Sequence, residues 1–212
     1  METLGPQPTL IGPADLEAAI KEEHFSPALL PYNYDIFNAL VGKLVEREAF
    51  LASLPPSDQS FSRDLLTLEY DRLLYYLKKY LRLRLAKIEK NILFIFQKDL
   101  ASLLSKPEFE FALKFYRHFA SQLNGEIFSK VDERYGAKLF ELNALTPNRS
   151  NLGLSMADAP DDNHFVFVRF VDSAPNVVLD RGITMKFSKN DILLVAFKFV
   201  RTLVADGIAK LV

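Results

Sequence analysis

The segment 75–92, YYLKKYLRLRLAKIEKNI, constrains the fold most, because it joins an apolar helical stripe to a run of positive charge. Six cations lie between positions 78 and 90, and only Glu89 opposes them. When residues are placed 100° apart, as in an α-helix, the apolar side chains around this segment share one arc. They are Tyr70, Leu73, Leu74, Leu77, Leu81, Leu85, Ile88, Ile92 and Ile95. The arc predicts a long helix with one buried face.

Arg84 breaks the separation between charged and apolar residues. It falls inside the apolar arc, next to Leu81 and Ile88, where an unpaired guanidinium would be very costly. Two interpretations stay open. Arg84 pairs with a carboxylate of this chain or of another subunit, or it snorkels at the edge of the stripe. We predict that Leu81, Arg84, Leu85 and Ile88 belong to the core or to an interface.

The other cations of this segment have two interpretations as well. One is an ordinary solvated helix face. The other is a nucleic-acid contact through Lys78, Lys79, Arg82, Lys87 and Lys90. In the second case Tyr75, Tyr76 and Tyr80 are candidates for base stacking, although they also suit a helix core. Because the net charge of the 212 residues is only −1, any such binding has to be local rather than global.

The pattern along the chain predicts an α+β protein in which an all-α helical bundle domain precedes a small β-rich domain. Three prolines and two glycines indicate a mobile tail over 1–13. Helical periodicity then predicts an α-helical domain over 14–133, with helices up to a turn at 26–31, over 33–51 and over 62–100. A linker rich in Pro, Asn, Gly, Ser and Asp follows at 134–162, and the β-rich domain occupies 163–212.

Ser105 and Glu108 have the spacing of a capping box, and Pro107 falls in the first turn that follows. This pattern predicts that the next helix of the α-helical domain begins at this point. Its expected principal stripe is Phe109, Leu113, Tyr116, Phe119, Ala120, Leu123 and Ile127. Phe111 and Phe115 lie off this stripe and give the helix a second apolar side. The apolar surface of the domain is therefore wider than its own helices can cover, which points to partner surfaces.

The C-terminal 50 residues alternate strand-like runs with turns. We expect strands over 164–171, 177–179, 183–187, 192–197 and 208–212, and a short helix over 198–204. A domain of this size without disulfides is marginal alone. The first strand is apolar on both sides, so one side needs cover from outside the domain. The candidate docking residues are Phe165, Phe167, Leu193 and Leu194.

Residue patterns of known catalytic sites are missing from the sequence. The chain has no cysteine, and its three histidines lie in separate segments without metal-ligand spacing. Its few glycines form no phosphate-binding loop. No apolar run has the length of a signal peptide or of a membrane span. We therefore expect an intracellular protein that is not an enzyme and holds no cofactor.

Specific motifs resemble one family. Residues 81–90, LRLRLAKIEK, closely resemble the "YLRxRLxKIEK" signature of the Sld-five subunits of GINS, the four-subunit eukaryotic DNA replication complex. In the same order, 27–32 (PALLPY) resembles that family's "PELLPY", and 105–112 (SKPEFEFA) its "LSPEELEFA". Residues 165–169 and 190–212 resemble "YVFVR" and "GDIYLLRYxxIRDLVxxGxxELI". Ala28 and Asn190 depart from the Glu and Gly of these motifs, but Asn190 still suits the left-handed turn that Gly would supply.

The resemblance implies a non-catalytic structural subunit of the GINS heterotetramer, located in the nucleus. It implies three sibling subunits as partners and, beyond them, the MCM helicase, Cdc-forty-five and replisome polymerase or hub proteins. In that family the helical domain packs beside its siblings and the small C-terminal domain docks within the assembly. A helical nucleic-acid-binding module is the alternative function. Whether the N-terminal tail is a docking peptide stays open.

Overall fold

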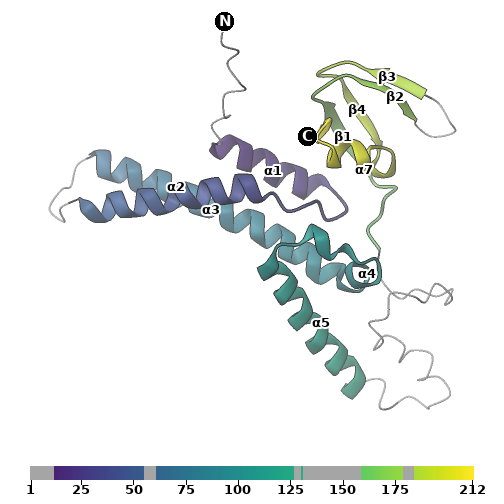
Figure 1. Cartoon of the computed structure of the whole chain (residues 1–212), viewed down its shortest axis with the longest axis horizontal. Coiled ribbons are helices and arrows are strands. Elements are labelled where there is room, and N and C mark those ends of the chain that lie inside the picture. The colour runs from purple at the N-terminus through teal and green to yellow at the C-terminus, as the bar shows by residue number, and fades with distance from the viewer. Residues whose placement is uncertain (1–11, 55–60, 127–129, 131–158, 179–183) are drawn as a thin grey trace, which may run out of the picture. The chain divides into compact units, whose positions relative to one another are not determined.

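The computed structural model describes residues 12–54, 61–126, 130, 159–178 and 184–212 (Figure 1). The helices come first along the chain, and a small antiparallel sheet follows, so the predicted α+β class is confirmed. The tail 1–11 and most of the linker 134–162 lie outside the described residues, and the domain boundaries expected there stay predictions. Of the helices described, none is long and apolar enough to cross a membrane.

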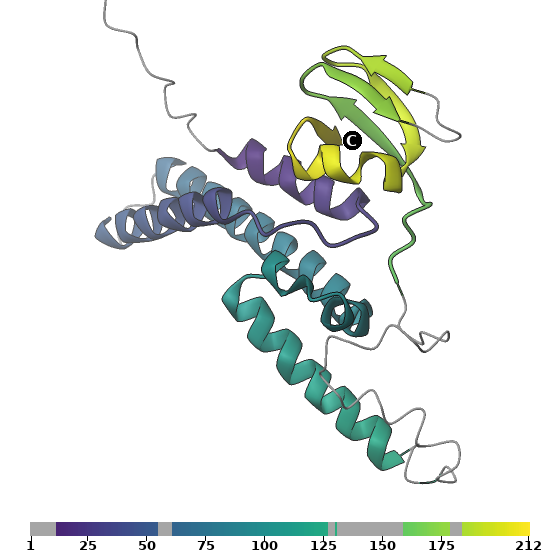
Figure 2. The ribbon, with the colours of Figure 1, turned by 45° about the vertical axis from the view of Figure 1, so that its right-hand side comes forward.

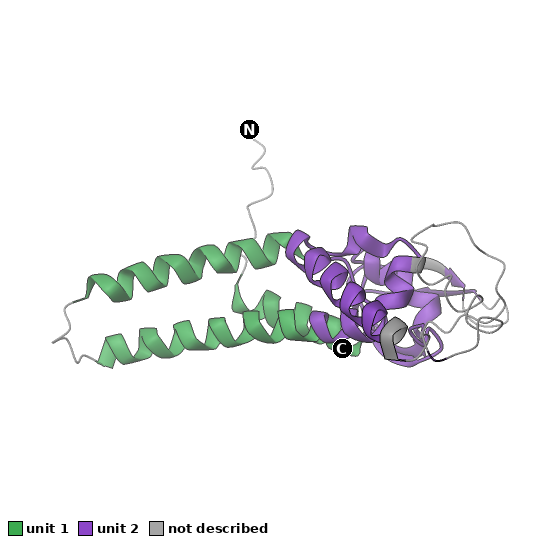
Figure 3. Cartoon of the chain, turned by 90° about the horizontal axis from the view of Figure 1, so that it is seen from below, with its two compact units in different colours: residues 1–25, 33–83, 212 green, residues 26–32, 84–211 purple. Residues whose placement is uncertain are grey.

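The chain divides into two compact units (Figure 3). One comprises residues 1–25, 33–83 and 212, and the other comprises residues 26–32 and 84–211. The division falls within helix α3, Phe61–Lys90, which therefore supplies side chains to both units.

The first unit is helical. It contains α1, Pro13–Phe25, and α2, Tyr34–Ser53, which pack against each other, together with most of α3. Asn33 caps α2, because its side-chain oxygen accepts a hydrogen bond from the Ile36 N–H at 3.2 Å. The buried side chains recur at helical spacing, as the sequence predicts: Leu16, Ile20, Leu40, Leu44, Leu73, Leu77 and Tyr80.

The continuous helix predicted over 62–100 is wrong beyond Lys90. Asn91 interrupts it with φ −109° and ψ 23°, and its side-chain amide donates to the Lys87 carbonyl at 3.1 Å. A short helix, α4 (Ile92–Gln97), follows, and Asp99 then turns the chain with a left-handed φ of 52° into the 3₁₀ helix η1, Leu100–Leu103. Apolar periodicity continues across Asn91, but the asparagine side chain competes for backbone groups and ends the regular helix.

Helix α5, Lys106–Glu126, begins where the capping box predicts. Of its predicted stripe, Tyr116 is buried, but Phe109 is 37% exposed, and the other buried side chains in the described part of the helix are Glu108 and Ala112. The small Ala112 lies between Glu108 and Tyr116, where a side chain without bulk allows a neighbouring element to come close.

The C-terminal domain contains a three-stranded antiparallel sheet with the order β4-β1-β5, formed by Ile192–Ala196, Phe165–Phe170 and Ala209–Leu211. Strands β2 (Ala174–Val178) and β3 (Thr184–Phe187) pair separately. Helix α7, Phe197–Ala205, lies beside the three-stranded sheet (Figure 2). Asn190 has a φ of 72°, as its place in the turn predicts, and the chain ends in this sheet as expected.

The core of the C-terminal domain lies on one side of β1. Val166, Val168 and Phe170 point into it, and their exposed fractions are at most 4%. Val168 lies opposite Leu193 on β4 and Leu211 on β5. Phe197 and Val200 of α7 complete the cluster. The alternation of β1 therefore leaves its other side chains on the opposite face of the sheet.

Candidate protein interfaces and the Arg84 cluster

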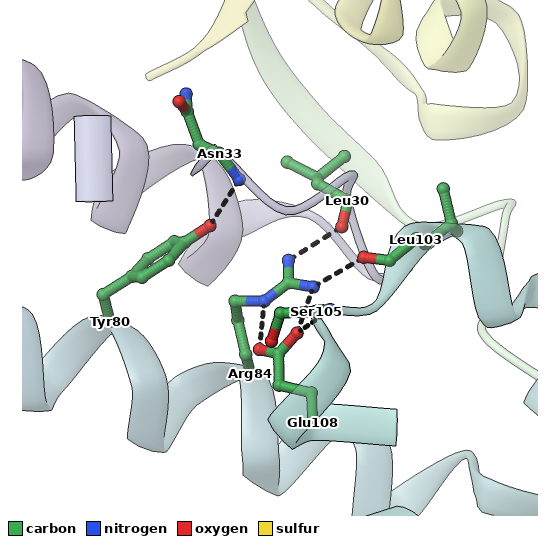
Figure 4. Close-up of polar contacts among 7 residues, drawn as sticks. All are labelled: Leu30, Asn33, Tyr80, Arg84, Leu103, Ser105 and Glu108. Carbon is green, nitrogen blue, oxygen red and sulfur yellow. Dashed lines mark hydrogen bonds and ion pairs between the residues drawn. The ribbon is translucent and has the colours of Figure 1, made fainter. Parts of the chain in front are cut away.

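Arg84 is completely buried and forms an ion pair with Glu108 of α5 (Figure 4). Its Nε donates to Glu108 Oε1 at 2.7 Å, and its Nη2 donates to Oε2 at 3.2 Å. This side-by-side arrangement is the strongest geometry available to an arginine and a carboxylate. The partner that the sequence left open therefore belongs to this chain, and the snorkelling interpretation is wrong.

Two backbone carbonyls complete the surroundings of the Arg84 guanidinium (Figure 4). Nη1 donates to the Leu30 oxygen at 2.8 Å, and Nη2 donates to the Leu103 oxygen at 2.9 Å. The guanidinium also lies 5.2 Å from the centre of the Tyr32 ring, within the range of a cation–π contact. Every guanidinium nitrogen thus donates a hydrogen bond, which compensates for the loss of water around the buried charge.

Glu108 also caps the start of α5. Its Oε2 accepts the Ser105 backbone N–H at 2.9 Å, which is one half of the capping box. The reciprocal half is not formed, because within the described chain the buried Ser105 hydroxyl has no hydrogen-bond partner. Sequence reasoning found Glu108 only as a cap. The same carboxylate neutralises Arg84 and begins α5, and we call Arg84, Glu108, Ser105, Leu30 and Leu103 the Arg84 cluster.

The positive residues of α3 do not form one surface. Lys78, Lys79, Arg82 and Lys90 are exposed, but Lys87 is half-buried and its ammonium donates to the Ala28 carbonyl at 3.2 Å. Of the tyrosines considered for stacking, Tyr75 is 58% exposed. Tyr80 is 3% exposed, and its phenol oxygen accepts the Asn33 N–H at 3.3 Å. The prediction of a stacking role for Tyr80 is therefore wrong.

The second face of the C-terminal sheet carries large exposed apolar side chains, together with the exposed Arg169 of β1 and Lys210 of β5. Phe165 and Phe167 of β1 are 65% and 56% exposed, and Phe167 lies opposite Leu194 of β4. Directly paired residues share a face of the sheet, so Leu194 and its neighbour Ile192 extend this surface. We call Phe165, Phe167, Ile192 and Leu194 the outer sheet face.

Leu193 lies on the other side of the same strand and packs against the core of the C-terminal domain. The sequence-based choice of docking residues thus combined Leu194, which lies on the exposed face of the sheet, with Leu193, which lies on the core face. Strict alternation along β4 was the signal that would have selected Ile192 instead.

A second exposed apolar surface lies on α3, within the first unit. Phe61, Leu65, Leu68 and Tyr75 are exposed, Phe61 by 81% and Leu68 by 66%. Their spacing of four, three and seven residues places them along one side of the helix. We call these four residues the α3 outer stripe. Sequence reasoning did not select it, because the buried arc of the same helix dominates the periodicity.

The remaining candidates lie around the helical core of the second unit. That core contains Leu29, Ile88, Ile92, Ile95, Leu104, Ala112 and Tyr116. Leu85, Phe111 and Phe115 are partly buried and pack against it, and the rings of Phe111 and Phe115 stack at 6.1 Å. Leu81 belongs to the first unit, where it is partly buried. Burial raises the pKa of the Tyr116 phenol, so it stays protonated at neutral pH. The use of these residues in an interface stays a prediction.

The C-terminal domain and the full chain both have recognised relatives. Residues 160–212, which include the outer sheet face, match the family model of the DNA replication complex GINS protein SLD5 C-terminus. Over 98% of its length the chain is 27% identical to the Rattus norvegicus protein named DNA replication complex GINS protein SLD5, of which 94% is covered. The chain is thus similar to proteins named GINS SLD5 along almost its whole length. The Homo sapiens SLD5 protein shows the same identity and coverage. The Debaryomyces hansenii SLD5 protein is also 27% identical, over 91% of this chain and 83% of its own.

These similarities confirm the resemblance to the Sld-five subunits that was drawn from the motif at 81–90 and from the C-terminal motifs. The structure shows what two of the SLD5-like motifs do. In LRLRLAKIEK, Arg84 and Ile88 are fully buried and Lys87 bonds to the Ala28 carbonyl. In SKPEFEFA, Glu108 is the partner of Arg84. Two of the SLD5-like motifs are thus joined by an ion pair within one compact unit.

Proposed function

We propose that the chain is a non-catalytic structural subunit of the GINS heterotetramer and acts in DNA replication in the nucleus. The relation to proteins named as GINS SLD5 over almost the whole chain carries this proposal. Its partners are three sibling subunits and, through them, the MCM helicase, Cdc-forty-five and replisome polymerase or hub proteins. ATP hydrolysis and strand separation belong to the helicase, and this chain contributes interface area.

The two exposed apolar surfaces support a role in assembly. The outer sheet face and the α3 outer stripe present large side chains with exposed fractions between 51% and 81%. Removing such surface from water yields about 25 cal/mol for each Å² of apolar area. Partners that cover these faces therefore stabilise the subunit as well as the complex. Contiguous exposed apolar patches are typical of interaction sites.

The ionisable groups of the Arg84 cluster suit a structural role better than a chemical one. Arg84 and Glu108 are shielded from solvent, and their charged atoms bond to each other and to backbone groups. A catalytic acid or base needs access to a substrate proton. We infer that this pair fixes the geometry of the subunit so that its apolar faces are presented correctly.

Co-expression with the three presumed siblings tests the proposal. The outer sheet face is changed by Phe167→Asp and Leu194→Asp, and Lys186→Asp on β3 is the matched control at an exposed site. Light scattering should give the mass of the tetramer for the unchanged chain and for the control. For the two variants we expect loss of the tetramer, because a carboxylate in a buried apolar interface is costly. Recovery of the full tetramer with both variants would contradict docking through this face.

A nucleic-acid-binding module remains the second candidate, because Lys78, Lys79 and Arg82 are exposed together on α3. The engagement of Lys87 and the burial of Tyr80 count against it. Binding of the purified chain to duplex DNA, measured over a range of salt concentrations, decides the question. An affinity whose logarithm falls with the logarithm of salt at a slope near −0.9 per phosphate contacted would favour this function. Lack of measurable binding at low salt would leave the cations as a solvated face.

A further inference from the structure

The segment 26–32 lies between two hydrophobic cores of the second unit, and we call it the strap. Ala28 is 4% exposed and belongs to the core cluster of the C-terminal domain, together with Val166 and Val168. The next residue, Leu29, belongs instead to the helical core around Ile88. Leu30 packs against the C-terminal cluster again. The strap therefore contributes side chains to both cores, Ala28 and Leu30 to that of the C-terminal domain and Leu29 to the helical one.

The backbone of the strap is held by two cations of α3. Lys87 donates to the Ala28 carbonyl at 3.2 Å, and Arg84 donates to the Leu30 carbonyl at 2.8 Å. These cations are three residues apart, on neighbouring positions of the helix surface. The carbonyls they hold belong to the two strap residues whose side chains contact the C-terminal core. At the end of the strap, the Tyr32 N–H donates to the Leu103 carbonyl at 3.2 Å.

We propose that the strap couples the C-terminal domain to the Arg84–Glu108 ion pair, with Arg84 and Lys87 as positioning residues. Arg84 stays in place because Glu108 binds it, and Arg84 in turn fixes the carbonyl of Leu30. If the ion pair is broken, the strap loses its anchor, and Ala28 and Leu30 leave the C-terminal core. A domain of about 50 residues has little stability to spare. It therefore loosens although no residue of its own has changed.

This coupling lies within one chain and does not depend on the proposed role in GINS. Because coupling free energies are reciprocal, the effect must also run in the opposite direction. A cavity in the C-terminal core must loosen the strap and weaken the Tyr32 hydrogen bond to Leu103. A merely local role of Arg84 in the helical core would give neither of these two distant effects.

Hydrogen exchange of the full chain, followed by mass spectrometry, tests the coupling with Arg84→Gln. Arg82→Gln is the matched control, because Arg82 is exposed two residues away on the same helix. We expect amides of β1 and β5 to exchange at least about tenfold faster in Arg84→Gln and to be unchanged in the control. The milder Lys87→Gln should accelerate the same amides by about threefold. Unchanged exchange of β1 in both Arg84→Gln and Lys87→Gln would overturn the proposal.

Arg84→Gln could also unfold the whole chain, which faster exchange of α2 amides would reveal. The reverse experiment then decides. Val168→Ala removes two methyl groups from a fully buried position in the C-terminal core. We expect faster exchange of the strap amides, including that of Tyr32, while α2 amides keep their rates. If Val168→Ala accelerates only the strands of the C-terminal domain, the strap is not coupled to it.

Discussion

The Arg84 cluster buries charged groups, whereas the outer sheet face exposes apolar ones. In the cluster, two charged side chains are removed from water, and each polar atom of the ion pair finds a partner in the same chain. On the outer sheet face, four large apolar side chains stay more than half exposed. The first region is complete within the subunit. The second is suited to a surface that another molecule covers.

The difference separates what fixes the fold from what drives association. A buried ion pair adds little net stability relative to apolar residues of the same shape, yet breaking it is expensive. It therefore makes one arrangement of α3, α5 and the strap much better than its alternatives. Exposed phenylalanines contribute little to the isolated fold but much to an interface. Changes in the two regions should consequently affect different measurements.

Removing the carboxylate of Glu108 should have the largest effect. Glu108→Ala leaves the Arg84 guanidinium buried without its counter-charge and also removes the acceptor for the Ser105 N–H. We expect a loss of about 3–5 kcal/mol in the free energy of unfolding, measured by urea denaturation. Glu110→Ala is the matched control, since Glu110 is exposed on the same helix. Equal losses for the two variants would show that the ion pair does not hold the fold.

The two faces of β1 give the sharpest internal comparison. Phe170 is fully buried and Phe167 is 56% exposed in the same strand. Phe170→Ala should cost about 3–5 kcal/mol of unfolding free energy. Phe167→Ala should cost less than about 1 kcal/mol but should weaken assembly with the siblings. If Phe167→Ala destabilises the isolated chain as much as Phe170→Ala, the outer face is covered within the chain.

Local signals in the sequence predicted local structure well. Ser105 and Glu108 marked the start of α5, Asn190 marked a left-handed turn, and the apolar strand-like run at 164–171 predicted β1. Each of these predictions depends on residues a few positions apart, where backbone preferences and local hydrogen bonds determine the local conformation. The same holds for the apolar arc of α3, which predicted its buried side.

Contacts between distant segments could not be read in this way. Glu108 is 24 positions from Arg84, and its capping role already explained its presence. Ala28 was noted only as a missing charge, although it reaches the core of the C-terminal domain. A small residue gives no hydrophobic signal of its own, and its burial depends on tertiary packing. The Arg84 cluster and the strap therefore needed the three-dimensional structure.

Two helix caps can be compared, one outside the Arg84 cluster at Asn33 and one within it at Ser105. Asn33→Ala removes the acceptor for the Ile36 N–H at the start of α2 and should cost about 1 kcal/mol. Ser105→Ala, at the start of α5, should change the unfolding free energy by less than about 0.5 kcal/mol, because the Ser105 hydroxyl has no partner in the described part of the chain. Urea denaturation measures both. A loss of about 1 kcal/mol or more for Ser105→Ala would mean that its hydroxyl, and not only Glu108, caps α5.

The smallest effect is expected for the exposed cations of α3. A variant that combines Lys78→Gln, Lys79→Gln and Arg82→Gln removes three positive charges from the helix that carries Arg84. Because these side chains are exposed, the unfolding free energy should change by less than about 0.5 kcal/mol, and tetramer recovery with the siblings should be unchanged. Loss of assembly in this variant would place the cationic side of α3 in an interface. The contrast with Glu108→Ala then isolates burial, rather than charge, as the property that gives Arg84 its importance.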